Sequence, residues 1–312
     1  MMHTRLLLAL AALCAGLCGC AALPDTSLER EAAPTTTPLE PEPRPAPIVF
    51  SSDRSGDYLG LFVLHASGQE AASLLAGDAN LFAGPWSPDG QRILFTGFGP
   101  VHSYVGVANA DGSSPTDLTQ QPDSDEAFPA WSPDGTQIAF TSRRDGNNEI
   151  YRMQTDGSDP TRLTSAPGDD FAPSWSPDGG QIAFASDRDR TPGLYSIYVM
   201  DADGANVRRI TQGDGNDYSP AWSPDGKRIA FRSHRAGAAD IWLVNLDGTD
   251  LRNLTDNPGE DWSPSWSSDG SLLLFQTNRD GNWEIYLMRS DGSEARNLTN
   301  HPADDEYPFM SP

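Results

Sequence analysis

Acidic and basic side chains recur along this chain at fixed distances from aromatic residues. Each acid of a first set stands five residues before a repeated tryptophan or, in the last copy, before Met310; the set is Glu126, Asp170, Asp217, Asp261 and Asp305. Each arginine of a second set stands four residues after a repeated phenylalanine; the set is Arg54, Arg144, Arg188, Arg235 and Arg279. Facing carboxylates and guanidinium groups form charge-assisted hydrogen bonds, whereas unpaired carboxylates attract cations.

The spacing of the two sets favours pairing. In four copies the acid and the arginine are equally far from a turn glycine, as Asp170 and Arg188 are from Gly179. Residues equidistant from a hairpin turn face each other across its two strands. The copy with Leu81 in place of the acid also has Gly99 in place of the arginine. We therefore predict a structural acid–arginine pair in the other copies; the alternative is that these acids line a channel mouth and bind a cationic ligand.

A further group of acids has no recurring basic partner and directly precedes the acidic position in four copies. It comprises Asp125, Asp169, Glu260 and Asp304. Aromatic residues recur beside these acids and would supply apolar contact area at the same place; they are Phe128, Phe171, Tyr218, Trp262 and Tyr307. Together with the first set, these acids are the predicted contacts for a ligand or partner. The unpaired group is the stronger candidate for direct contact.

No constellation of residues predicts catalysis. The five histidines fall at unrelated places in the repeats, and no Gly-x-Ser-x-Gly, His-Glu-x-x-His or phosphate-binding loop occurs. We expect no catalytic residue, no metal site and no cofactor. The 312 residues include 44 acids and 21 bases, giving a formal charge of −23, which argues against nucleic-acid binding because such binding relies on Lys and Arg.

The elements that position these residues come from a repeat of about 44 residues. Trp-Ser-Pro-Asp-Gly begins at Trp86, Trp131, Trp175 and Trp222, and Trp266 begins a variant with Ser in place of Pro. Each turn is followed by an alternating apolar run, a second apolar stretch and an Asp-Gly dipeptide. Four short strands in this length are typical of a propeller blade. We predict an all-β fold over residues 48–312, a six-bladed β-propeller of four-stranded antiparallel blades.

The two ends of the repeat region complement each other. The first copy begins at Ile48 with a second-strand pattern, and the last ends with a first-strand pattern at residues 306–312. We therefore expect residues 306–312 to pair beside residues 48–76 and to close the ring, which would leave few exposed sheet edges.

The N-terminal region is predicted to contain a lipoprotein signal peptide followed by a tether. Residues 1–19 combine Arg5, an apolar run and Leu17-Cys18-Gly19 before Cys20, a pattern similar to a bacterial lipobox, which predicts lipidation of Cys20. The alternative is an ordinary signal peptide with incidental cysteines. Residues 20–47 contain seven prolines and no aromatic residue, which predicts a disordered tether.

The repeat Pro-x-Trp-Ser-Pro-Asp-Gly, followed by Ile-Ala-Phe, Asp-Gly and Leu-Thr, resembles the WD40-like repeats of the C-terminal propeller of the TolB family. The resemblance covers about 265 residues and implies a periplasmic, envelope-associated propeller. Before residue 48 this sequence has no counterpart of the N-terminal α/β domain of that family, and it has a lipobox, so the resemblance does not imply a role in the Tol system itself.

From these features we expect a non-enzymatic cell-envelope lipoprotein that binds a protein or peptide partner at the acidic channel mouth. The lipid anchor would be its only membrane contact, on the outer membrane facing the periplasm or on the outer face of the plasma membrane in a single-membrane bacterium. We expect a monomer. The alternative function is a polysaccharide-active or glycan-binding propeller, such as a metal-dependent oligogalacturonate lyase, because some propellers with this repeat are such enzymes.

Overall fold

The computed structural model describes residues 46–64 and 70–312. The predicted signal peptide with the lipidation site Cys20 and almost all of the predicted tether lie outside the described residues. The described secondary structure consists of 24 β-strands. None of the described residues belongs to a helix that is long and apolar enough to cross a membrane.

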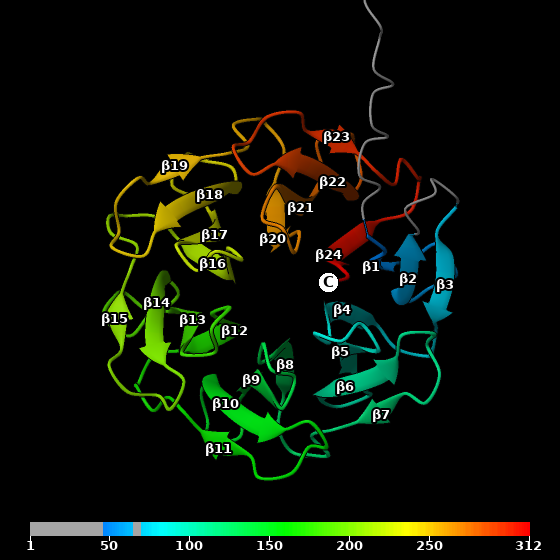
Figure 1. The fold of residues 1–312 in the computed structure, drawn as a ribbon. Helices are drawn as coiled ribbons and strands as arrows, with labels where there is room; N and C mark the ends of the chain where they lie inside the picture. Colours follow the sequence, from blue (N-terminus) through cyan, green and yellow to red (C-terminus); the bar gives the residue numbers. More distant parts are fainter. Residues whose placement is uncertain (1–45, 65–69) are drawn as a thin grey trace, which may run out of the picture. The chain divides into compact units, whose positions relative to one another are not determined.

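The strands form six four-stranded antiparallel sheets, the blades, which are arranged in a ring around a common centre (Figure 1). Five blades consist of four consecutive strands. Blade 2 contains β4 (Leu81–Trp86), β5 (Arg92–Phe98), β6 (Ser103–Asn109) and β7 (Thr116–Asp117). Blade 3 contains β8 (Glu126–Trp131), β9 (Gln137–Ser142), β10 (Glu149–Gln154) and β11 (Thr161–Arg162). Blade 4 contains β12 (Asp170–Trp175), β13 (Gln181–Ser186), β14 (Ser196–Asp201) and β15 (Arg208–Arg209).

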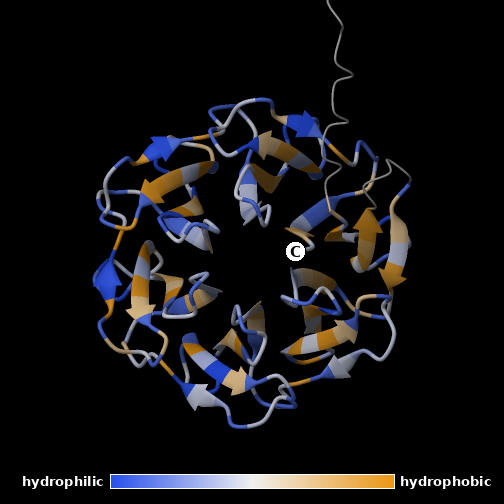
Figure 2. Cartoon of the chain, in the orientation of Figure 1, coloured by the Kyte–Doolittle hydropathy of each residue, from blue (hydrophilic) through white to orange (hydrophobic). Residues whose placement is uncertain are grey.

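Blades 5 and 6 repeat the same order. Blade 5 contains β16 (Asp217–Trp222), β17 (Arg228–Ser233), β18 (Asp240–Asn245) and β19 (Arg252–Asn253). Blade 6 contains β20 (Asp261–Trp266), β21 (Leu272–Thr277), β22 (Glu284–Arg289) and β23 (Arg296–Asn297). The first strand of each blade lies nearest the ring centre and is called its inner strand. Figure 2 shows that the outermost strands β15, β19 and β23 are hydrophilic.

Blade 1 joins the two ends of the described chain. It contains β24 (Asp305–Met310), β1 (Ile48–Ser52), β2 (Gly60–Leu64) and β3 (Ala72–Leu75), in that order across the sheet. The inner strand β24 pairs with β1, with Ile48 opposite Met310 and Ser52 opposite Asp305 (Figure 1). The predicted six-bladed fold and its closure by the last strand are therefore confirmed.

The inner strands carry a bulge that links neighbouring blades. In β12 the pairing with β13 shifts between Phe171 and Ser174, and Ala172 adopts a positive φ of 54°. The freed Ala172 N–H donates to Thr141 Oγ1 of blade 3 at 3.0 Å. Equivalent residues with positive φ occur in four further inner strands; they are Phe128, Ser219, Ser263 and Tyr307. A bulge turns side chains of a strand toward a new direction, here toward the channel.

The hydrophobic core lies between adjacent blades. One buried cluster combines Ile197 and Val199 of blade 4 with Trp222 and Phe231 of blade 5. Repeated tryptophans also donate hydrogen bonds across the blade boundary, as Trp131 Nε1 does to the carbonyl of Pro85 at 3.2 Å. The tryptophans are therefore packing residues that hold the ring together.

Candidate functional site

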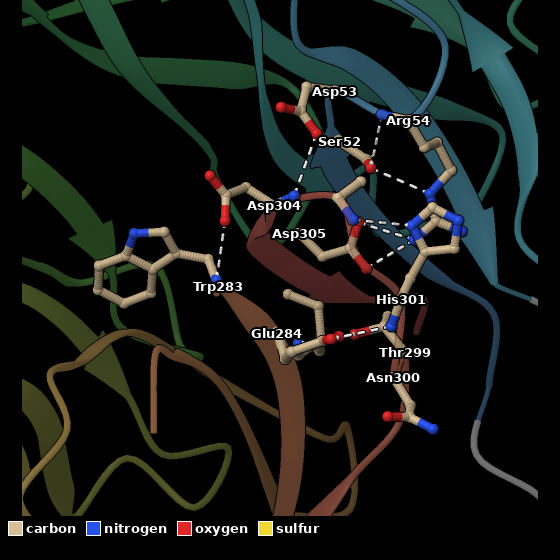
Figure 3. A network of polar contacts seen from close by, with 12 residues as sticks. Ser52, Asp53, Arg54, Trp283, Glu284, Thr299, Asn300, His301, Asp304 and Asp305 are labelled. Atoms are coloured by element: carbon tan, nitrogen blue, oxygen red, sulfur yellow. Dashed lines mark hydrogen bonds and ion pairs between the residues drawn. The ribbon is translucent and has the colours of Figure 1, made fainter. Parts of the chain in front are cut away.

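The structure brings each acid of the first set together with one arginine of the second set. In each of these five blades the acid begins the first strand and the arginine follows the end of the second strand. Because the two strands are antiparallel, both residues lie at the end of the blade away from the Trp-Ser-Pro-Asp-Gly turn. The closest N···O distances are 2.9 Å for Arg144–Glu126, 2.6 Å for Arg188–Asp170, 2.7 Å for Arg235–Asp217, 3.0 Å for Arg279–Asp261 and 2.6 Å for Arg54–Asp305. The last pair connects the two ends of the described propeller (Figure 3).

Aromatic rings and a hydroxyl group hold each arginine in place. In blade 4, Arg188 lies 5.0 Å from the ring of Phe184 and 5.3 Å from the ring of Tyr198. Its Nε donates to Ser186 Oγ at 3.0 Å. Ser186, not Arg188, is the direct strand partner of Asp170, so the pair is offset by two residues. A guanidinium stacked on rings and bonded at its edge is well ordered, which favours a structural role for the pair.

The five paired acids are almost fully buried. The relative exposure of Glu126, Asp170, Asp261 and Asp305 is 0%, and that of Asp217 is 1%. Burial raises the pKa of Asp170, and the hydrogen bond and charge of Arg188 oppose this shift. A ligand at the mouth could reach these carboxylates only by displacing an arginine. The five paired acids are therefore buried beside their arginines, which favours a structural role, and their direct contact with a ligand stays a prediction.

Blade 2 lacks the pair and fills its place with an aromatic ring. Leu81 is 6% exposed, and the ring of Tyr104 packs edge-on against Phe95 with centroids 6.2 Å apart. Gly97 leaves room for this ring, because a Cβ there would lie 2.3 Å from the Cζ atom of Tyr104. The absent ion pair thus has an apolar replacement.

Three acids of the unpaired group accept a backbone hydrogen bond from the preceding blade. Asp125 accepts from Ser103 N at 3.0 Å, Asp169 from Asn148 N at 2.8 Å and Asp304 from Trp283 N at 2.9 Å (Figure 3). The same position holds Asn80 in blade 2 and Asn216 in blade 5, whose side-chain oxygens accept from Leu59 N and Tyr195 N at 2.9 and 2.8 Å.

This link between blades needs an acceptor oxygen and no charge. Because two blades use asparagine, the carboxylates of Asp125, Asp169 and Asp304 carry charge beyond what the link requires. Asp125 has a side chain that is 50% exposed, and Asp169 and Asp304 are half-buried. Glu260 differs, since it accepts from the indole Nε1 of Trp262 at 3.2 Å. We call the end of the channel that bears these four acids the acidic mouth.

Aromatic side chains surround the acidic mouth in clusters that cross blade boundaries. Tyr195 packs against Phe171 at 4.8 Å and against Tyr218 at 5.2 Å between ring centroids. Trp262 and Trp283 lie 4.7 Å apart. The sequence indicated Phe171, Tyr218 and Trp262 but missed Tyr195 and Trp283. Both missed residues directly precede the third strand of a blade. An alignment of the repeats at that position would have found them.

A third missed residue is a cation inside this cluster. Arg232 follows the repeated Phe231 of β17, at a position held in other blades by Ser51, Thr96, Thr141, Ala185 and Gln276. Its guanidinium carbon lies 4.2 Å from the ring centroid of Tyr218 and 4.5 Å from that of Trp262. Burial lowers the pKa of Arg232, and the charges of Tyr218, Tyr307 and Glu260 oppose this. A comparison of this single position across the repeats would have identified it.

Two further polar side chains on the inner strand β24 are mostly buried. Burial raises the pKa of Glu306, against the opposing hydrogen bond from Gln276. Tyr307 stacks on Phe82 with ring centroids 4.5 Å apart, and burial raises its pKa as well. A cavity of about 390 Å³ lies between the inner strands and the tryptophan turns. The cavity is lined by described Trp, Pro, Ala, Ser and other uncharged residues, so the charges concentrate at the acidic mouth.

A buried acid at the same end of blade 5 leads to a pH prediction. Asp240 is 3% exposed, and burial raises its pKa to about 6. Its ordinary value is near 3.9, so the folded state loses stability as pH rises from about 4 through about 6. Asp240→Asn, which stays neutral and can still accept from Asn253, should raise the free energy of unfolding by about 1–3 kcal/mol at pH 8 and by little at pH 4.

Urea unfolding followed by tryptophan fluorescence at both pH values measures this difference. The prediction does not hold if Asp240→Asn changes stability equally at pH 4 and pH 8.

The described residues 46–64 and 70–312 contain no group of three or more His, Cys, Asp or Glu side chains that could hold a metal ion.

Six antiparallel blades around a channel, with charged and aromatic side chains gathered at one mouth, define a six-bladed β-propeller with a candidate binding face. The chain belongs to the TolB beta propeller domain family, whose model matches residues 47–219 and 214–312. The comparison with curated proteins found no match.

Solved structures support the fold assignment. TolB from Acinetobacter baumannii is 23% identical, with a TM-score of 0.75 over 86% of this chain and 67% of that chain. A putative TolB from Agrobacterium tumefaciens is 26% identical, with a TM-score of 0.65 over 82% of this chain and 88% of that chain. Oligogalacturonate lyase from Vibrio parahaemolyticus is 14% identical, with a TM-score of 0.53 over 80% of this chain and 71% of that chain.

Proposed function

We propose that this protein is a non-enzymatic lipoprotein of the bacterial cell envelope that binds a protein or peptide partner at the acidic mouth. The observation that carries the proposal is the use of aspartate at Asp125, Asp169 and Asp304, where asparagine serves the same link in other blades. A charge that the scaffold does not need, beside partly exposed aromatic rings, favours contact with a cationic partner. Family membership and the periplasmic location implied by the TolB resemblance support a role in the envelope.

The role of the acidic mouth can be tested by removing its charge without removing the link between blades. The triple variant Asp125→Asn, Asp169→Asn and Asp304→Asn retains three acceptor oxygens. We expect it to capture about tenfold less of the cross-linked partner from envelopes than the wild type, since each lost charge pair weakens electrostatic association. Capture by the wild type should also fall when ionic strength rises from about 0.05 M to about 0.5 M.

A matched triple variant provides the control. Asp111→Asn, Asp156→Asn and Asp291→Asn make the same change in charge at exposed turns on the opposite end of the blades. This control should capture as much partner as the wild type. Equal capture by both triple variants, or indifference to salt, would remove the acidic mouth from the proposal.

A separate prediction concerns the lipid anchor at Cys20. Cys20→Ala should release the protein from membranes into the soluble fraction, because a lipidated N-terminal cysteine would be its membrane attachment. Fractionation and immunoblotting measure the shift, and globomycin, which blocks lipoprotein signal cleavage, should cause accumulation of the uncleaved precursor. Cys18→Ala is the control and should remain membrane-bound. Unchanged membrane association of Cys20→Ala would contradict the lipoprotein assignment.

A polysaccharide lyase remains the alternative function, favoured by the shared fold of the Vibrio parahaemolyticus oligogalacturonate lyase. Incubating the purified protein with oligogalacturonate and a divalent metal distinguishes a lyase from a binding protein. Formation of unsaturated products, followed by ultraviolet absorbance, would favour the lyase, whereas the binding proposal expects none. We further expect a monomer in solution.

A further inference from the structure

Arg232 projects from the second strand of blade 5 to the boundary between blades 5 and 6. Its guanidinium carbon lies over the ring of Tyr218 from inner strand β16 and over the ring of Trp262 from inner strand β20, at 4.2 and 4.5 Å. The side chain is only partly exposed. Two rings from neighbouring blades therefore contact the guanidinium, and neither supplies a carboxylate for its N–H groups.

The hydrogen-bonding edge of this guanidinium has no acceptor within the part of the chain that the structure describes. The Nε atom of Arg232 is buried and lacks a hydrogen-bond partner, and no described carboxylate lies within ion-pair distance. The nearby Arg235 shows the contrast, because its edge is satisfied by both oxygens of Asp217 at 2.7 Å and by Ser233. A buried N–H without a partner is unfavourable, so an external acceptor would stabilise the arrangement.

Glu260 acts on Arg232 through its charge, and one of its oxygens is already hydrogen-bonded. That oxygen accepts from Trp262 Nε1 at 3.2 Å. The surrounding acids at the mouth would repel a doubly charged anion more strongly than a singly charged one. A carboxylate is singly charged and planar, and it pairs with two N–H groups of a guanidinium edge.

We propose that Arg232 is a binding residue for a carboxylate of the partner peptide, either its C-terminal carboxylate or an Asp or Glu side chain. This inference rests on the proposed peptide-binding function and specifies the ligand chemistry inside the mouth. Tyr218 and Trp262 hold the guanidinium and contact the apolar part of the bound residue. The partner segment then carries a carboxylate for Arg232 and cationic groups for the acids around it, which defines its orientation in the channel.

Small probes test this without the natural partner. N-acetylphenylalanine supplies a C-terminal carboxylate, N-acetylphenylalaninamide is its neutral counterpart, and N-acetylglutamate N-methylamide supplies a side-chain carboxylate. Each is titrated into the purified full chain while the arginine Nε–H resonances are followed by NMR; the Arg232 resonance is assigned from its loss in Arg232→Lys. We expect at least one carboxylate probe to shift this resonance and to bind about tenfold more tightly than the amide.

Two variants of equal charge complete the test. Arg232→Gln should abolish the preference for carboxylate over amide. Arg228→Gln lies on the same strand, with its guanidinium 5.7 Å from the Trp266 ring at the opposite end, and should retain the preference. The wild-type resonance shift keeps the test decisive if Arg232→Gln folds poorly. The carboxylate probe that binds more tightly shows whether the partner supplies its C-terminal carboxylate or an Asp or Glu side chain.

Several outcomes would overturn the inference. They are equal affinity for acid and amide, a preference that survives Arg232→Gln, and an Arg232 resonance that stays unchanged up to the solubility limit of the probes. Tighter binding of galacturonate than of either peptide probe would replace the peptide with an acidic sugar. Failure here, with partner capture still dependent on the acids of the mouth, would leave the proposed function intact; loss of that dependence would remove the proposed function separately.

Discussion

Deleting residues 305–312 should abolish cooperative folding of the propeller. The deletion removes β24, the partner of β1, and thereby exposes a strand whose five residues are all buried. It also leaves Arg54 without Asp305 and removes Tyr307 from its stack on Phe82. The lost contacts exceed about 5 kcal/mol, which is comparable to the whole stability of many domains. Near-ultraviolet circular dichroism and urea unfolding measure the outcome.

A shorter deletion is the matched control. Removing Ser311 and Pro312 deletes one backbone hydrogen bond, from Ser311 N to the carbonyl of Pro47 at 2.8 Å, and should reduce stability only slightly. A synthetic peptide of residues 304–312 added to the longer deletion should restore part of the cooperative transition, because it can re-form the pairing with β1. A cooperative transition near the wild-type midpoint for the longer deletion alone would show that closure of the ring is dispensable.

Arg235→Met should lower the free energy of unfolding by about 3–5 kcal/mol, since removing one partner of a buried ion pair leaves an uncompensated charge. Its partner Asp217 is 1% exposed and accepts two hydrogen bonds from Arg235. The guanidinium also lies 5.5 Å from the ring of Phe231 and 5.1 Å from the ring of Trp242, so methionine preserves part of the packing. Urea unfolding measures the loss.

The double variant Asp217→Leu and Arg235→Met copies blade 2, where Leu81 stands in the acid position. It should be more stable than Arg235→Met alone, because no unpaired buried charge remains. Arg228→Met on the same strand is the control for the loss of an arginine that packs on an aromatic ring, and it should cost less than about 1 kcal/mol. Additive effects of the two single substitutions would argue against a coupled pair.

Most of the fold could be predicted from the sequence because its pattern is local. Trp175, the turn that follows it and Phe184 lie within one hairpin, so the alternation of side chains and the turn glycine determine which residues pair. The same reasoning brought Asp170 toward Arg188 to within two residues of the observed register. One residue of the offset arises at the turn, where Trp175 pairs with Ile182. The other arises from the bulge at Ala172, which sequence spacing does not reveal, since the residue with positive φ is not a glycine.

The candidate site was only partly predictable because its contacts cross blade boundaries. The sequence marked Asp169 and Asp304 as acids without a basic partner, but not as acceptors from Asn148 and Trp283 of the preceding blades. It also grouped the paired acids with the possible ligand contacts and did not reveal that they are buried. Exposure depends on how neighbouring sheets pack, which no single repeat specifies.

The sequence by itself determined the repeat, the strand order within each blade, the complementary ends and the identity of the acid and arginine partners. These features follow from side-chain alternation and short turns, which act between residues close in the chain. Only the tertiary structure decided which charges face the channel. Arg232 meets Trp262, thirty residues away, because the curvature of the ring brings the inner strands of adjacent blades together, and that curvature comes from side chains packed between sheets.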